Sequence, residues 1–65
     1  MTKEEIYDKA NSVVGLGGMT VNERLYESGL IDLFDKTKKK DKDLAKTILE
    51  AVRVDQASIK KILKI

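Results

Sequence analysis

The amino-acid sequence predicts an all-α protein, a small bundle of four or five short helices. Apolar residues recur at the 3.6-residue spacing of a helix in successive segments of the chain. Four of these segments directly follow a Thr or an Asp, residue types that cap helix N-termini. No run of residues alternates apolar and polar side chains for long enough to indicate a half-buried strand. The chain of 65 residues is therefore expected to form one helical domain, residues 1–65, with a small core.

The first predicted helix begins at Lys3, because Thr2 and Glu5 have the three-residue spacing of a capping box. Its apolar stripe comprises Ile6, Tyr7, Ala10, Val13 and Val14. We expect the helix to end at Gly15, since residues 15–18 contain three of the four glycines and glycine costs conformational entropy inside a helix. Residues 15–18 are predicted to be a mobile loop.

A second capping box, formed by Thr20 and Glu23, predicts a helix over residues 21–36. Its apolar stripe comprises Leu25, Tyr26, Leu30, Leu33 and Phe34. Gly29 lies in the middle of this segment, where a glycine costs roughly 1 kcal/mol relative to alanine. Two explanations stay open: the helix kinks or breaks at Gly29, or another part of the backbone packs closely against it.

Two more helices are predicted in the C-terminal half of the chain. Asp41 is a suitable cap for a helix over residues 42–52, and Asp55 for a last short helix. The apolar stripe of the first comprises Leu44, Ala45, Ile48, Leu49 and Val52. In the last helix the apolar face comprises Ile59, Ile62 and Leu63, and Lys60, Lys61 and Lys64 lie outside it.

The composition excludes the commonest catalytic and metal-binding chemistries. With no Cys and no His, the chain has no disulfide, no thiolate nucleophile, no Cys/His zinc site and no imidazole base. Two pairs of carboxylates share a helix face, Asp32 with Asp35 and Glu23 with Glu27, but such pairs are usual on a solvent-exposed surface. A chain of this length also leaves no room for a deep substrate pocket. We therefore expect no enzymatic activity, no cofactor and no bound metal.

The apolar runs are too short for a membrane span, which needs roughly 20 residues. The N-terminus lacks the basic start and apolar stretch of a secretory signal. The expected location is therefore the cytoplasm, with no membrane partner.

Charge is distributed unevenly along the chain. Residues 1–35 carry three basic and seven acidic side chains, whereas residues 36–65 carry ten basic and four acidic ones. Such asymmetry can steer a charged partner. Alternatively, the acidic and basic halves face each other within the bundle. Lys38, Lys39, Lys40 and Lys42 lie in a dense lysine run that either binds phosphates or keeps a helix end solvated.

Residues 48–63 resemble a helix-turn-helix, the DNA-binding arrangement of two helices and a tight turn. The residues that match its pattern are Val54, Asp55, Ile59, Ile62 and Leu63. The resemblance implies that Gln56, Ala57, Ser58, Lys60 and Lys61 face the DNA. Two residues depart from the pattern, since Arg53 stands where the turn usually has Gly and Leu49 where the first helix usually has Ala.

Residues 20–63 also resemble small uncharacterised bacterial proteins that begin near Met-Thr-Val-Asn-Glu-Arg-Leu. The similarity rests on residues 20–25, on residues 28–35 and on the region of residues 48–54. It implies a bacterial, cytosolic helical domain and transfers neither an activity nor any site residue. Residues 1–18 lie outside it, which suggests an appended first helix and an older start at Met19.

One further group of residues suggests a protein-binding surface. The guanidinium of Arg24 is expected to hold Asp32 or Asp35, or a carboxylate of a partner. Small residues around Gly29, beside Tyr26 and Leu30, form a notch that either accepts a partner helix or a second copy of the chain, or serves internal packing.

These patterns favour a non-enzymatic protein-interaction or regulatory module that uses Arg24, Tyr26, Gly29 and Leu30, or a charged face. One alternative is a nucleic-acid-binding domain. Its candidate residues are Lys38, Lys39, Lys40, Lys42, Gln56, Lys60 and Lys61. The other alternative is a self-associating structural domain, because small cores often gain stability from oligomerisation.

Overall fold

The computed structural model describes residues 1–65 and contains five α-helices and no strand, which confirms the predicted fold class. The helices are α1 (Lys3–Asn11), α2 (Val21–Ser28), α3 (Ile31–Lys40), α4 (Lys42–Ala51) and α5 (Gln56–Leu63), with a single 3₁₀ turn, η1 (Leu16–Gly18). All four predicted caps are confirmed. The side chains of Thr2, Thr20, Asp41 and Asp55 each accept a hydrogen bond from the backbone N–H three residues later.

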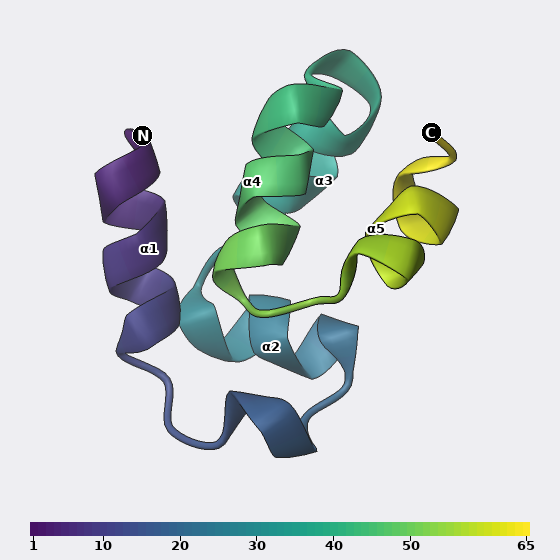
Figure 1. Ribbon diagram of the computed structural model, residues 1–65. Helices are drawn as coiled ribbons and strands as arrows, with labels where there is room; N and C mark the ends of the chain where they lie inside the picture. The colour runs from purple at the N-terminus through teal and green to yellow at the C-terminus, as the bar shows by residue number, and fades with distance from the viewer.

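Helix α4 is the centre of the bundle. Helices α1, α3 and α5 all pack against it, and α2 packs against α1 and α3 (Figure 1). Four apolar side chains of α4 and its C-cap are completely buried: Ala45, Ile48, Leu49 and Val52. On α1, Ile6 and Ala10 are completely buried in the same core, so the first helix is packed as part of the bundle.

The first helix is shorter than predicted. It ends at Asn11 rather than at Gly15, and the side chain of Val14 is 91% exposed. The hydroxyl of Ser12 donates to the carbonyl oxygen of Lys9 at 2.7 Å, and such a side-chain bond competes with the backbone bonds that continue a helix. The valines at 13 and 14 therefore do not extend the apolar stripe.

The glycine segment makes a turn of 3₁₀ helix. Gly15 has φ +82°, a left-handed conformation that glycine adopts without steric cost and that turns the chain away from α1. Leu16 follows it and is buried. Leu16 is not one of the residues of the core cluster around α4.

The predicted second helix breaks at Gly29, which separates α2 from α3. Gly29 has φ +74°, and the N–H of Leu30 bonds to the carbonyl oxygen of Leu25, as in a glycine-terminated helix. The close-packing explanation is wrong. A Cβ built on Gly29 would lie 3.9 Å from Nζ of Lys9 and within 4 Å of no other atom.

The break changes which side chains of this segment are buried. Leu30 and Phe34 are buried, Leu33 is only half-buried at the edge of the core, and Tyr26 is 74% exposed. The prediction that Tyr26 belongs to the core is wrong, because its stripe assumed one continuous helix.

Polar groups are well satisfied inside this small core. No buried side-chain nitrogen or oxygen lacks a hydrogen-bond partner. None of the helices combines the length and apolar character that crossing a bilayer requires.

Candidate binding surfaces

The structure does not assemble the predicted protein-binding notch. Leu30 is completely buried, and Gly29 ends α2. Tyr26 is exposed at the surface of α2, and no pocket opens beside it. Of the small-residue notch, only the exposed tyrosine ring is therefore available to a partner.

Arg24 binds the protein's own backbone instead of a carboxylate. Its Nε donates to the carbonyl oxygen of Met19 at 3.0 Å, and its Nη1 donates to those of Arg53 at 3.1 Å and Val52 at 3.3 Å. The expected pairing with Asp32 or Asp35 is not formed. Arg24 thus ties the start of α2 to the turn between α4 and α5, which is a structural task.

In the turn between α4 and α5, the backbone is left-handed at the position where a helix-turn-helix usually has glycine. Arg53 occupies that position with φ +65°. Of the residues that carry the resemblance, Val54, Ile59 and Leu63 are buried, whereas Asp55 and Ile62 are exposed.

The N-terminal end of α5 is acidic and already bonded within the chain. The side-chain amide of Gln56 donates to Oε2 of Glu50 at 2.9 Å. Asp55 caps the helix, and hydrogen bonds from the side chain and the backbone N–H of Ser58 hold the pKa of Asp55 below its usual value. A DNA-reading helix presents this end to the base edges of the major groove. The carboxylates of Asp55 and Glu50 here would bring negative charge close to the negatively charged DNA.

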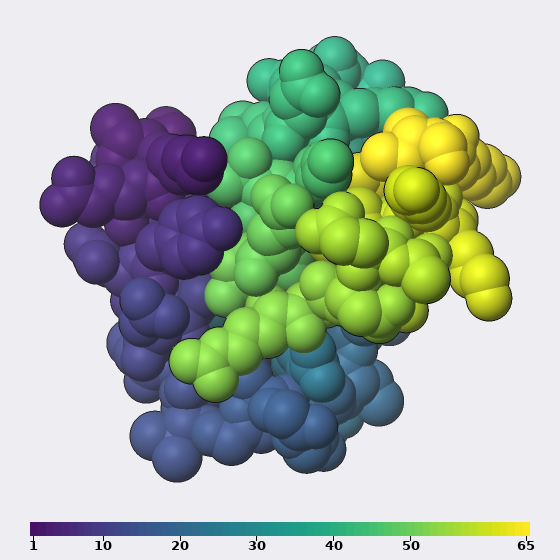
Figure 2. Space-filling view, in the orientation of Figure 1, coloured from purple at the N-terminus to yellow at the C-terminus, as the bar shows by residue number.

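The one pocket of the molecule lies at the opposite end of α5. It is a cleft of about 470 Å³, here named the lysine cleft, lined by Lys38, Lys39, Lys42, Ile62, Leu63 and Lys64. The end of α3, the start of α4 and the end of α5 meet there. In the space-filling view the teal surface of the α3–α4 turn lies against the yellow surface of the chain's last residues (Figure 2).

Local structure explains why these lysines converge. Asp41 ends α3 and caps α4, so the chain reverses within one residue and the last turn of α3 lies beside the first turn of α4. Nζ of Lys42 then donates to the carbonyl oxygen of Leu63 at 2.9 Å, which attaches the end of α5 to the start of α4. Lys64 follows in a left-handed conformation, φ +57°, at the edge of the cleft.

The cleft contains part of the predicted nucleic-acid set and adds residues that sequence reasoning missed. Lys38, Lys39 and Lys42 line it, whereas Lys40, Gln56, Lys60 and Lys61 do not. The additional lining residues are Ile62, Leu63 and Lys64. In the sequence, the only indication that these residues belong to a charged surface is that Lys64 lies outside the apolar face of the last helix.

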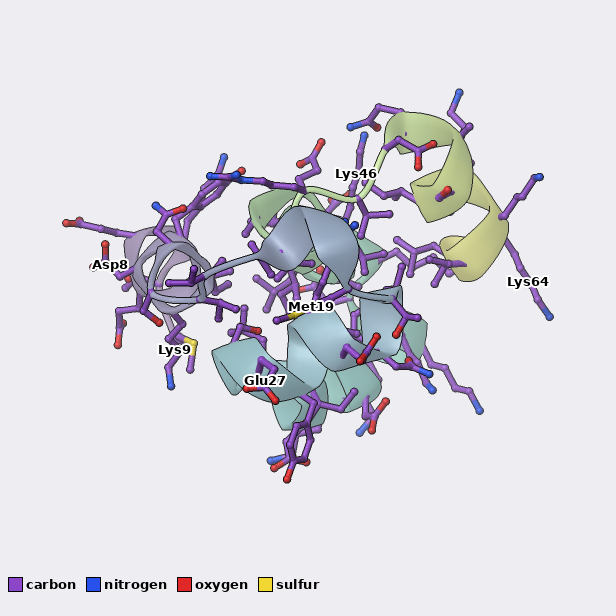
Figure 3. The ribbon with its side chains drawn as sticks, turned by 90° about the horizontal axis from the view of Figure 1, so that it is seen from below. Asp8, Lys9, Met19, Glu27, Lys46 and Lys64 are labelled. Atoms are coloured by element: carbon purple, nitrogen blue, oxygen red, sulfur yellow. The ribbon has the colours of Figure 1, made fainter.

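Only one ion pair joins the acidic half of the chain, residues 1–35, to the basic half, residues 36–65. The single salt bridge joins Lys38 to Asp35 at 3.5 Å, within α3 itself and at the surface. Seen from below, Asp8 on α1 and Lys64 after α5 lie at opposite edges of the molecule (Figure 3). Lys39, Lys42 and Lys64 thus have no carboxylate within salt-bridge distance.

No group of three or more acidic, His or Cys side chains is placed to hold a metal ion. No family model, curated protein or solved structure matches this chain.

Proposed function

We propose that this chain is a non-enzymatic protein-interaction module that binds an acidic segment of a partner protein in the lysine cleft. The observation that carries the proposal is the convergence of Lys38, Lys39, Lys42 and Lys64 around one cleft, in which only Lys38 has a carboxylate partner. Like charges gathered around one cleft repel one another, and a bound anion relieves that repulsion.

The cleft also suits recognition by charge because it is partly organised before any ligand arrives. The hydrogen bond from Lys42 to Leu63 holds one ammonium group in place, and its two other N–H donors remain for a ligand. Each exposed lysine–carboxylate pair contributes about 0.2 to 1 kcal/mol, so the four lysines together contribute at most about 4 kcal/mol, the binding free energy of a weak, millimolar complex. Unpaired positive charge further speeds the encounter with an acidic partner.

Nucleic acid is the second candidate, favoured by the same lysines. Two observations weigh against it. The acidic N-terminal end of α5 opposes docking in a major groove, and no aromatic side chain lines the cleft to stack on bases. Self-association is the third candidate, and a melting temperature that rises with protein concentration would indicate it.

The proposal is tested by nuclear magnetic resonance titration of the labelled protein with poly-L-glutamate and, separately, with a mixed-sequence DNA duplex, at about 50 and about 200 mM salt. We expect poly-L-glutamate to shift the amide signals of residues 38–42 and 62–64. The double variant Lys39→Gln, Lys64→Gln should lose most of this response.

The matched control is Lys36→Gln, Lys61→Gln, which removes the same charge from α3 and α5 outside the cleft. It should respond like the unaltered protein. Absence of cleft shifts at low salt, or equal loss in both double variants, would contradict the proposal. Tighter and more salt-dependent binding of the duplex would favour nucleic acid instead.

A further inference from the structure

Charge is not the only property of the lysine cleft. Ile62 lines it and is 39% exposed, although most other large apolar side chains of the helices are buried or half-buried. Its neighbours on α5 explain this position: Ile59 and Leu63, four residues apart, face the core, and Ile62 lies at the margin of their stripe. The cleft thus combines one exposed apolar side chain with four lysine residues.

From this combination we infer that the partner segment is an acidic amphipathic peptide, in which one large apolar side chain packs on Ile62 between carboxylates that bind the lysines. The inference rests on the proposed function and specifies its ligand. A partner that covers Ile62 removes apolar surface from water, which favours binding in addition to charge. Lysine side chains lay their methylene stems along apolar surface, so we expect the stems of the lining lysines to extend this apolar contact.

The size and lining of the cleft agree with this occupant. Its volume of about 470 Å³ accommodates a few side chains and lies within the range of about 300 to 1,000 Å³ typical of ligand pockets. A nucleic-acid backbone presents phosphates but no aliphatic group for Ile62, and the cleft contains neither Arg nor an aromatic ring for its bases. Charge complementarity and the exposed isoleucine together therefore favour a peptide.

The test compares two fluorescently labelled peptides of equal charge by anisotropy. One has a central Leu flanked by Asp and Glu residues, and the other has Ser in place of that Leu. We expect the Leu peptide to bind about 5- to 20-fold more tightly, since the burial of part of one leucine side chain accounts for that ratio. The variant Ile62→Ser should abolish the preference and leave the affinity for the Ser peptide unchanged.

Val14→Ser is the matched control, because Val14 is also an exposed apolar residue but lies outside the cleft. This variant should retain the preference. Circular dichroism checks that each variant is folded, and Ile62→Ala, which keeps a good helix former in α5, should give an intermediate preference if Ile62→Ser unfolds.

The outcomes separate the inference from the function on which it rests. Equal, salt-sensitive binding of both peptides would overturn the apolar contact and leave the acidic-partner proposal intact. Failure of both peptides to bind at low salt would overturn both. A preference that persists in Ile62→Ser would overturn the role assigned to this side chain.

Discussion

Arg24 is the clearest case of a single side chain that connects distant parts of the chain. Its guanidinium donates to backbone carbonyl oxygens on both sides, of Met19 before α2 and of Val52 and Arg53 after α4. A guanidinium suits this task because its donors are fixed in a planar fork. Arg24 therefore helps to hold α2 against the turn that leads into α5.

Replacement of Arg24 by Ala should lower the free energy of unfolding by about 1 to 3 kcal/mol, since hydrogen bonds from a charged donor are lost. Arg24→Lys should recover only part of this, because one ammonium group cannot reproduce the fork. Urea denaturation measures both effects. An Arg24→Lys protein as stable as the original would show that the fork geometry is unimportant.

The carboxylates of the two capping boxes predict a pH dependence of stability. Hydrogen bonds from the backbone N–H and the hydroxyl of Thr2 lower the pKa of Glu5 below 4.5, and those of Thr20 lower the pKa of Glu23 in the same way. A carboxylate whose pKa is lowered by folding stabilises the fold above its unfolded pKa. This stabilisation is lost as pH falls through the lower, folded pKa.

Stability should therefore decrease as pH falls below 4.5. The double variant Glu5→Gln, Glu23→Gln should show a shallower decrease, because Gln keeps the capping geometry without a titrating group. The measurement is the urea midpoint as a function of pH, with Glu4→Gln, an exposed neighbour, as control. Identical pH profiles for the double variant and the original protein would refute this explanation.

The ends of α2 and α4 are both followed by a left-handed residue, and only the end of α2 has glycine there. Gly29 ends α2 with φ +74°, whereas Arg53 follows α4 with φ +65°. A non-glycine residue in this conformation costs roughly 1 to 2 kcal/mol. The end of α4 therefore carries a strain that the end of α2 lacks.

Substitutions at these two ends should change stability in opposite directions. Gly29→Ala should destabilise by about 1 to 2 kcal/mol, and Arg53→Gly should stabilise by up to about 1 kcal/mol. Gly17→Ala serves as control, because its φ lies outside the left-handed region and a Cβ there meets no atom within 4 Å. Thermal unfolding would show the three effects. A loss of stability in Arg53→Gly would mean that this turn is not strained.

The burial of α4 at the centre of the bundle predicts which leucines and isoleucines contribute most to the free energy of unfolding. Ile48→Ala should destabilise by about 2 to 5 kcal/mol, the usual range for a completely buried aliphatic side chain. Leu33→Ala should cost less than about 2 kcal/mol, because half-burial places Leu33 at the edge of the core. Chemical denaturation of the two variants tests this order, and a larger effect at Leu33 would contradict the observed orientation of α3.

The side chains that stabilise the fold and the lysines proposed to bind a partner lie in different parts of the molecule. The core surrounds α4, whereas Lys38 and Lys39 are exposed at the end of α3. Their joint replacement by Gln should change the free energy of unfolding by less than about 0.5 kcal/mol for each site. The same double variant should bind acidic peptides more weakly. A large loss of stability would show that these lysines support the fold.

The fold class and four of the five helix starts followed from the sequence, whereas the start of α3 and the protein-binding surface did not. Thr20 and Glu23 identified the start of α2 because a capping box joins residues three apart. The prediction that Tyr26 lies in the core was wrong. It assumed an apolar stripe along one continuous helix, and the break at Gly29 ends that helix. The predicted end of the first helix, Gly15, was also wrong. The hydroxyl of Ser12 donates to the carbonyl oxygen of Lys9, and this bond competes with the backbone bonds that would continue the helix.

The sequence by itself determined the class of fold and four helix caps, because these depend on residue types and on contacts within one helical turn. It also excluded chemistry that needs a Cys or His side chain, since the chain has neither. Only the tertiary structure decided that Lys39 and Lys64 share a cleft with Ile62, and that Arg24 binds the carbonyl oxygens of residues 52 and 53. Those contacts join residues more than 20 positions apart. The cleft exists because α3 and α5 pack on the same central helix, and the Arg24 contacts join α2 to the end of that helix, so both depend on the packing of the whole core.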